Sequence, residues 1–246
     1  MGSHTNTPPQ FADAMLTDFA EHGDTIRKWL EAYWHCREFE RQARVAMCVH
    51  DEFRYGKERC PDCGVAKADW EDNVQGYRDA LAVHNERTQP GIIADPKLSM
   101  AFLTGRCGGG KTRALFAIMR ADGELARASK VWGGCEYLRL PHLVLQLQQM
   151  MGADSADCVG EVDRLSAAET LLLLDDLGAG KMTPWAIGIV GEIIDERQAG
   201  GRRTVVTSNL GLDQISDQYD DRIASRLAGG TVWEFKGKDH RIKGDE

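Results

Sequence analysis

The chain has 246 residues, 42% hydrophobic and 28% charged, which is ordinary for a globular protein with one large domain or two smaller ones. No apolar run approaches the roughly 18 residues that a membrane span requires. The first ten residues lack the apolar core of a signal peptide, so we expect a cytoplasmic protein without membrane contacts. The formal net charge of −8 excludes a globally basic nucleic-acid binder, and any contact with DNA or RNA must come from a local patch.

The first ninety residues predict a small helical domain. Apolar residues recur at three- and four-residue steps over residues 11–47, and residues 68–86 show a second helical pattern. Two prolines and a glycine in residues 87–97 indicate a linker. We therefore expect a helical N-terminal domain at 1–90 and a second domain at 91–246.

From residue 97 onward, predicted strands alternate with predicted helices. Short apolar runs, of the kind that form strands covered on both faces, lie at 97–105, 170–176 and 203–209, and a strand interrupted by a glycine pair is expected at 130–140. Helical stretches, one with a threonine cap and two with proline in the first turn, lie between these runs at 111–121, 141–151 and 183–201. This alternation predicts an α/β fold with a mainly parallel sheet.

A glycine-rich loop, GRCGGGKT, follows the first of these strands. It fits G-x-x-x-x-G-K-[ST], and it lies between a predicted strand and a predicted helix, as this pattern requires. Glycines let backbone N–H groups face phosphates, and the following helix N-terminus adds partial positive charge. We expect Lys111 to reach the β- and γ-phosphates of ATP and Thr112 to bind Mg²⁺. The expected nucleotide-binding residues are Gly105, Arg106, Cys107, Gly108, Gly109, Gly110, Lys111, Thr112 and Arg113.

Two later strands end in polar residues. Asp175 and Asp176 close one apolar run; Asp175 is the candidate for holding Mg²⁺ through water, and Asp176 for polarising the attacking water. The other strand ends in Thr207, Ser208 and Asn209, at the sheet edge where open α/β folds bind ligands, and Asn209 could orient the lytic water. The alternatives are a turn after the first strand and a polar strand end or helix cap after the second.

Arg222 and Arg226 lie four residues apart, so a helix would project both from one face. A cation presented to the γ-phosphate by a neighbouring subunit stabilises the charge of the transition state. The alternative interpretation is a surface helix with charged side chains.

In this order, the motifs GRCGGGKT, LLLLDDLG, TVVTSNL, DRIASRL and GKDHR resemble the helicase-loader branch of the AAA+ ATPases, the DnaC, DnaI and IstB-like proteins. The resemblance covers roughly residues 96–243. The paired aspartates support it, because this branch commonly carries Asp-Asp where most AAA+ proteins carry Asp-Glu. It implies that Asn209 is sensor I and that the arginine finger is Arg226 or Arg222, with Arg226 favoured. Arg241 matches a position to which we assign no role.

The resemblance implies an AAA+ ATPase that forms rings or open spirals. Such a protein would bind single-stranded DNA and deliver a replicative, hexameric DnaB-type helicase in DNA replication, as in phage-type loaders. An IstB-like transposition regulator is the alternative. Lys130, Tyr137 and Arg139 are candidates for stacking on bases and following the DNA backbone, or else ordinary surface positions.

Cysteines and a histidine cluster in the segment MCVHDEFRYGKERCPDCG. Two short pairs of ligands are what a structural zinc site uses, and such a site leaves no position for catalytic water. The expected Zn²⁺ ligands are Cys48, His50, Cys60 and Cys63. The segment also resembles HGEF…CPxC of phage and DnaI-like loaders. Alternative ligands are His35, Cys36 and His84, and the alternative interpretation is a set of reduced cysteines in a small helical domain.

Overall fold

The computed structural model describes residues 7–47, 58–60, 64–86, 96–128, 134–180 and 182–236. By its internal contacts the chain divides into two compact units. The larger unit combines Met1–Glu31 with Ile93–Glu246, and the smaller unit is Ala32–Ile92. Within the described ranges, no helix combines the length and the apolar character needed to cross a membrane.

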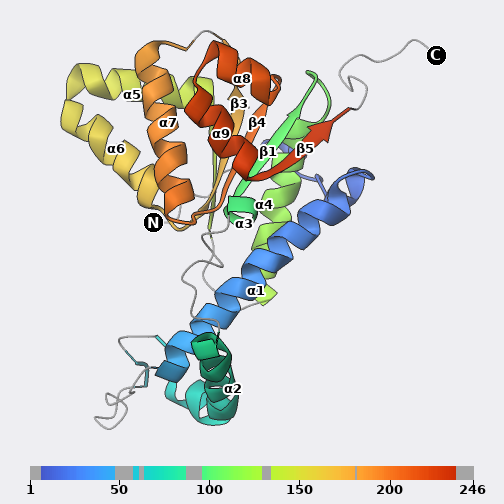
Figure 1. The fold of residues 1–246 in the computed structure, drawn as a ribbon, viewed down its shortest axis with the longest axis vertical. Coiled ribbons are helices and arrows are strands. Elements are labelled where there is room, and N and C mark those ends of the chain that lie inside the picture. The colour runs from blue at the N-terminus through green and yellow to red at the C-terminus, as the bar shows by residue number, and fades with distance from the viewer. Residues whose placement is uncertain are drawn as a thin grey trace. The chain divides into compact units, whose positions relative to one another are not determined.

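The larger unit is built on a five-stranded sheet in which every pairing is parallel (Figure 1). The strand order is β2-β3-β4-β1-β5. The strands are β1 Met100–Gly105, β2 Cys135–Arg139, β3 Leu171–Leu177, β4 Thr204–Ser208 and β5 Thr231–Phe235. The α/β fold with a mainly parallel sheet is thus confirmed.

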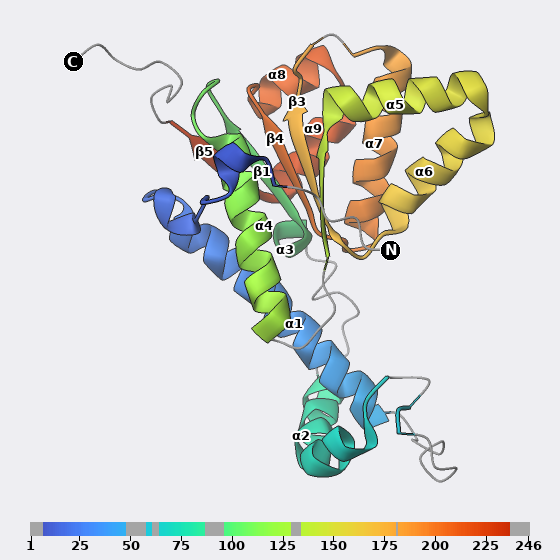
Figure 2. The ribbon, with the colours of Figure 1, turned by 180° about the vertical axis from the view of Figure 1, so that it is seen from behind.

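Helices cover both faces of this sheet (Figures 1 and 2). One face carries α4 Lys111–Ala128, and the short α3 Pro96–Ser99 leads into β1. The other face carries α5 Leu140–Ala153, α6 Ser155–Ala167, α7 Pro184–Ala199, α8 Leu212–Gln218 and α9 Asp221–Gly229. The helix patterns expected at 111–121, 141–151 and 183–201 correspond to α4, α5 and α7.

The core lies in two layers because successive strand residues point to opposite faces. Leu172, Leu174 and Val206 pack with α5–α9, whereas Leu173 and Val205 pack with α4. These central strand residues have exposures of at most 1%, which explains why their sequences are continuous apolar runs.

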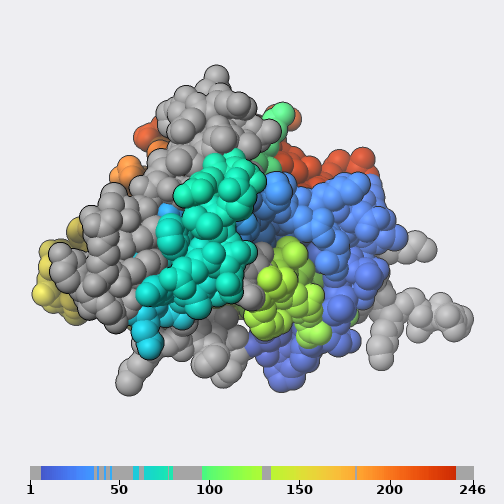
Figure 3. Space-filling view, turned by 90° about the horizontal axis from the view of Figure 1, so that it is seen from below, coloured from blue at the N-terminus to red at the C-terminus, as the bar shows by residue number. Residues whose placement is uncertain are grey.

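The first described residues do not form the helix that their periodicity predicted. Two short 3₁₀ turns, Pro9–Phe11 and Leu16–Asp18, precede α1, which spans Gly23–Met47. Ala14 and Leu16 are buried in the cluster that contains α4, as are residues at the start of α1. In the space-filling view, α4 in yellow-green lies beside the blue residues of the chain's start (Figure 3). The apolar spacing of residues 11–19 therefore reflects docking onto α4 rather than a first helix, whereas α1 begins within the break expected at 21–24.

The smaller unit contains the later part of α1 and α2 Lys67–Glu86. An isolated antiparallel bridge joins Arg59 to Ala66 beside a turn in which the Gly64 amide donates to the Cys60 carbonyl. The unit boundaries differ from the expected division at residue 90, because residues up to Glu31 group with the sheet. The second unit is therefore inserted within the chain of the first.

At the end of the sheet where the strands begin, a buried arginine joins three elements. The Arg197 guanidinium donates to the carbonyls of Leu165, Ala168, Thr170 and Arg203 at 2.6–2.9 Å, and to the Thr204 hydroxyl at 2.8 Å. Burial lowers the pKa of Arg197 to about 10, so it stays a cation at neutral pH. The end of α6 and the starts of β3 and β4 are thereby tied to one side chain.

Candidate nucleotide-binding site

The glycine-rich loop runs from the end of β1 into α4, as the sequence predicts. Gly105 has a φ of +136°, and a Cβ there would collide with the Phe235 carbonyl of β5. Gly110 has a φ of +89°, which also favours glycine over other residues. These two positions explain the glycines at the ends of the loop, which frame the N-terminus of an 18-residue helix.

Lys111 lies at this helix N-terminus and is 6% exposed. Its ammonium donates to the Gly105 carbonyl at 2.7 Å, the Arg106 carbonyl at 2.8 Å and Asn209 Oδ1 at 2.8 Å. The structure therefore brings together two of the predicted residues, Lys111 and Asn209, although they are 98 positions apart.

The Asp175 carboxylate accepts hydrogen bonds from hydroxyl groups on three different elements. Thr207 Oγ1 donates to Oδ1 at 2.5 Å, Tyr137 Oη donates to Oδ2 at 2.9 Å, and Thr112 Oγ1 lies 3.3 and 3.1 Å from the two oxygens. Asp175 is 1% exposed, so these donors satisfy a carboxylate that water does not reach. Burial, followed by the charge of Asp175, raises the pKa of Tyr137, which remains a neutral donor.

Asp176 has a different environment from its neighbour. Its φ is +64°, and it is the non-glycine residue with positive φ among the described parts of the chain. Its amide donates to Thr207 Oγ1 at 3.0 Å, so Thr207 contacts both aspartates. Its carboxylate is 3.4 Å from the Arg139 guanidinium, and the Asp176 side chain is 28% exposed. One aspartate is thus enclosed while the other faces the pocket.

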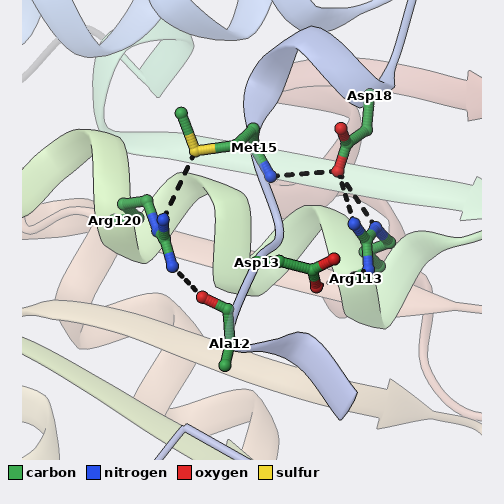
Figure 4. A network of polar contacts seen from close by, with 6 residues as sticks. All are labelled: Ala12, Asp13, Met15, Asp18, Arg113 and Arg120. Atoms are coloured by element: carbon green, nitrogen blue, oxygen red, sulfur yellow. Dashed lines mark hydrogen bonds and ion pairs between the residues drawn. The ribbon is translucent and has the colours of Figure 1, made fainter. Parts of the chain in front are cut away.

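Residues 8–19, called the N-terminal strap here, lie across α4 next to the loop (Figure 4). Arg113 donates to Asp18 Oδ2 at 2.8 and 3.0 Å and to Asp13 at 3.2 Å, while Arg120 donates to the Ala12 carbonyl. The Met15 amide and then the Arg113 side chain lower the pKa of Asp18 by donating to its carboxylate. Two arginines of α4 therefore hold the strap through charge-assisted hydrogen bonds.

A pocket of about 610 Å³ lies between the strap and the loop. Its volume is within the range of small-ligand sites. Its lining comprises Phe11, Asp18, Phe19, the loop residues 107–113, Arg139, Asp176, Ala179 and Asn209. Phe11 also stacks on Phe116 of α4, with ring centroids 4.9 Å apart. The pocket therefore combines a phosphate-type loop, an acid, an amide and an aromatic wall.

A pair of oxygen ligands beside this pocket fits a magnesium ion. The Thr112 hydroxyl and the Asp175 carboxylate are hard oxygen ligands held close together, the type that Mg²⁺ takes with few protein groups. The expected zinc site is a different case, because Cys48, His50 and Cys63 lie outside the described residues. Cys60 is buried, and the described ranges contain no cluster of three or more potential metal ligands. The zinc site stays a prediction.

The two candidate finger arginines lie on α9 and do not line the pocket. Arg222 Nη2 is 2.5 Å from Asp195 Oδ2, and Arg226 Nε is 2.7 Å from Asp195 Oδ1. A single carboxylate of α7 thus holds both side chains, which are 75% and 50% exposed. Arg241 and Lys130 lie outside the described residues.

Several pocket residues were not predicted from the sequence as nucleotide contacts. Phe11, Asp18 and Phe19 are about ninety positions before the loop, and no local motif links them to it. Tyr137 and Arg139 were considered only as DNA contacts or surface positions, yet they hydrogen-bond to the two aspartates. Their position on the strand that neighbours β3 was the available signal, because parallel neighbours end at the same edge.

No protein-family model and no curated protein sequence matches the chain. Among solved structures, the chain is similar to the DnaC helicase loader, with 18% identity and a TM-score of 0.49 over 70% of this chain and 100% of that one. It is similar to DnaI, with 24% identity and a TM-score of 0.47 over 68% of this chain and 84% of that one. It is also similar to the replication initiator DnaA bound to AMPPCP and single-stranded DNA, with 17% identity and a TM-score of 0.49 over 68% of this chain. The matched part is 47% of that DnaA chain, about half of its length.

Proposed function

We propose that the chain is an AAA+ ATPase that binds single-stranded DNA and loads a replicative, hexameric DnaB-type helicase. The observation that carries the ATPase part is the convergence of Lys111, Thr112, Asp175, Asp176 and Asn209 at one edge of the sheet, around a pocket of about 610 Å³. The order of the sequence motifs, which resembles that of helicase loaders, supports the choice of DNA and helicase as partners.

In this proposal, the loop amides and Lys111 bind the triphosphate, exchanging the carbonyl contacts of the ammonium for phosphate oxygens. Phe11 and Phe19 pack against the base. Asp176 accepts the proton of the attacking water, and Asn209 orients that water. Thr112 and Asp175 would hold Mg²⁺, which offsets the negative charge of the phosphates when bound. Lysine, aspartate and asparagine thus act on the same end of the nucleotide.

The remaining parts of the proposal concern assembly. Arg226, or Arg222 beside it, is exposed and lies outside its own pocket, which suits a cation supplied to the nucleotide of a second copy in a ring or spiral. Zn²⁺ bound by Cys48, His50, Cys60 and Cys63 would be structural in the smaller unit.

The proposal is tested by measuring ATP binding and phosphate release with and without single-stranded DNA. Lys111→Ala should abolish ATP binding, because it removes the cation that the phosphates meet at the helix N-terminus. Lys67→Ala is the matched control, since Lys67 lies on exposed α2 and pairs with Glu71. The ATPase proposal fails if folded wild-type protein neither binds nor cleaves ATP. The loading proposal fails if native mass measurements with the host's replicative helicase show no complex, with or without ATP.

A further inference from the structure

Tyr137 lies beside the candidate site but has no role in the proposed chemistry. It lies on β2, where Arg139 pairs with Asp175 of β3 and Tyr137 pairs with Leu173. Because side chains alternate along a strand, Tyr137 and Asp175 project from the same face of the sheet, the face that α4 covers. The Tyr137 hydroxyl donates to Asp175 Oδ2 at 2.9 Å.

The carboxylate of Asp175 is held from both neighbouring strands. Tyr137 of β2 binds Oδ2, and Thr207 of β4 binds Oδ1 at 2.5 Å. An ionised carboxylate can only accept hydrogen bonds, so each hydroxyl donates its proton and fixes one oxygen. Thr112, at the start of α4, approaches both oxygens from the side of the loop. Two hydroxyls therefore fix the plane of the carboxylate, and the third faces the nucleotide pocket.

The tyrosine ring is itself held in place. The rings of Tyr137 and Phe116 have centroids 4.7 Å apart, and Phe116 in turn stacks on Phe11 of the N-terminal strap. Phe116 lies one helical turn after Thr112 on α4, so the same helix supports the ring and presents the Thr112 hydroxyl. The contacts among the rings of Phe11, Phe116 and Tyr137 limit the directions in which the Tyr137 hydroxyl can point.

We propose that Tyr137 is a positioning residue for the magnesium site, orienting the Asp175 carboxylate toward the Thr112 side of the pocket. The inference rests on the proposed function, in which Thr112 and Asp175 hold Mg²⁺ with the nucleotide. Tyr137 itself does not contact the metal or the substrate. Partners of this kind, which hydrogen-bond to a metal ligand, commonly change metal affinity by about 10- to 100-fold when they are removed.

The test uses Tyr137→Phe, which keeps the aromatic ring and removes only the hydroxyl. Binding of a fluorescent, non-hydrolysable ATP analogue is measured in EDTA and across a Mg²⁺ titration. The Mg²⁺ concentration for half-maximal tightening should rise about 10-fold or more, while affinity in EDTA stays at the wild-type value. Tyr219→Phe is the matched control, because its hydroxyl donates to the Gly180 carbonyl at 2.9 Å and not to an aspartate. It should keep the wild-type Mg²⁺ requirement.

Three results would overturn the inference, and they differ in what they say about the proposed function. If wild type shows Mg²⁺-dependent binding and Tyr137→Phe shows the same half-maximum, the positioning role is wrong and the ATPase proposal stands. If affinity falls equally in EDTA and in Mg²⁺, the hydroxyl supports the fold rather than the metal site. If wild type binds the analogue without any dependence on Mg²⁺, the magnesium site and the positioning role are both wrong, and the ATPase proposal is still decided by ATP cleavage.

Discussion

The two adjacent aspartates of this site have different surroundings, which suits the different roles proposed for them. Asp175 is enclosed by hydroxyls of Thr112, Tyr137 and Thr207, whereas Asp176 lines the pocket with its backbone in the left-handed region. Asparagine and aspartate tolerate this region better than other non-glycine residues. The backbone conformation therefore adds a reason, besides proton transfer, for an aspartate at this position.

Asp176→Asn should bind ATP with wild-type affinity but hydrolyse it about 100-fold more slowly or worse, because an amide cannot accept the proton. Its melting temperature should stay close to wild type. Asp176→Ala should show the same loss of hydrolysis and lose about 1–2 kcal/mol of unfolding free energy as well, since alanine is disfavoured at a φ of +64°. Thermal melts and phosphate-release assays of both variants measure these effects. Equal stability of the two variants would contradict the strain argument.

The loop, the aspartate pair and Asn209 could be predicted from sequence because each belongs to a short contiguous motif at a strand end. The residues that surround and hold these groups could not be predicted from the sequence. Tyr137 and Asp18 reach the site only through strand order and through docking of the strap, which are properties of the tertiary structure. Motif patterns thus identify the candidate catalytic groups better than the groups that hold them.

At the scale of elements, the N-terminal strap shows where periodicity misleads. Phe11, Met15 and Phe19 are spaced by four residues, which is typical of a helix. The structure instead has two 3₁₀ turns held to α4 by Arg113 and Arg120. The last strand, β5, was missed for the opposite reason: it has no continuous apolar run, because buried Trp233 and Phe235 alternate with exposed residues. Tertiary contacts override local preference in both segments.

The clamp between Asp18 and Arg113 should make the strap sensitive to acid. Because the folded state lowers the pKa of Asp18, the unfolded chain binds the proton more readily, and stability rises with pH across that window. The contribution is complete above the unfolded value of about 4 and is lost as pH falls through the folded value. Asp18→Asn should therefore melt below wild type at pH 6, and the difference should shrink as the pH falls below about 4. A difference in melting temperature that does not change with pH would contradict this expectation.

At the scale of the whole molecule, the chain leaves the sheet unit after Glu31 and returns at Ile93. The return point lies within the linker expected at 87–97, but the exit point was not predicted. Composition marks a boundary where prolines and glycines gather, and it gives no such signal inside α1, which runs through residue 31 without a break. The Trp29 indole donates to the Lys97 carbonyl at 2.8 Å, so a residue shortly before the exit point contacts a residue shortly after the return point.

Replacing residues 32–92 with a short glycine-serine linker should leave a folded unit that still binds ATP, because Trp29 and Lys97, which lie near the two ends in sequence, are hydrogen-bonded to each other. A variant that starts at residue 96 should have a much lower melting temperature and weaker ATP binding. It loses the strap and the start of α1, which pack on Phe116, Trp233 and Phe235. Each buried side chain contributes about 1.5–3 kcal/mol, so losing several removes much of a typical domain's stability. Thermal melts and nucleotide titrations of both variants would test this, and equal behaviour would contradict the division into units.

The Arg197 network has a mechanical consequence. One guanidinium fastens the end of α6 and the starts of β3 and β4, so these strands cannot slip past each other at that end. At the opposite end, Asp176 near the end of β3 and Asn209 directly after β4 lie next to the glycine loop. We therefore expect any rearrangement that accompanies nucleotide hydrolysis to move the loops after β3 and β4 rather than to shift these two strands against each other.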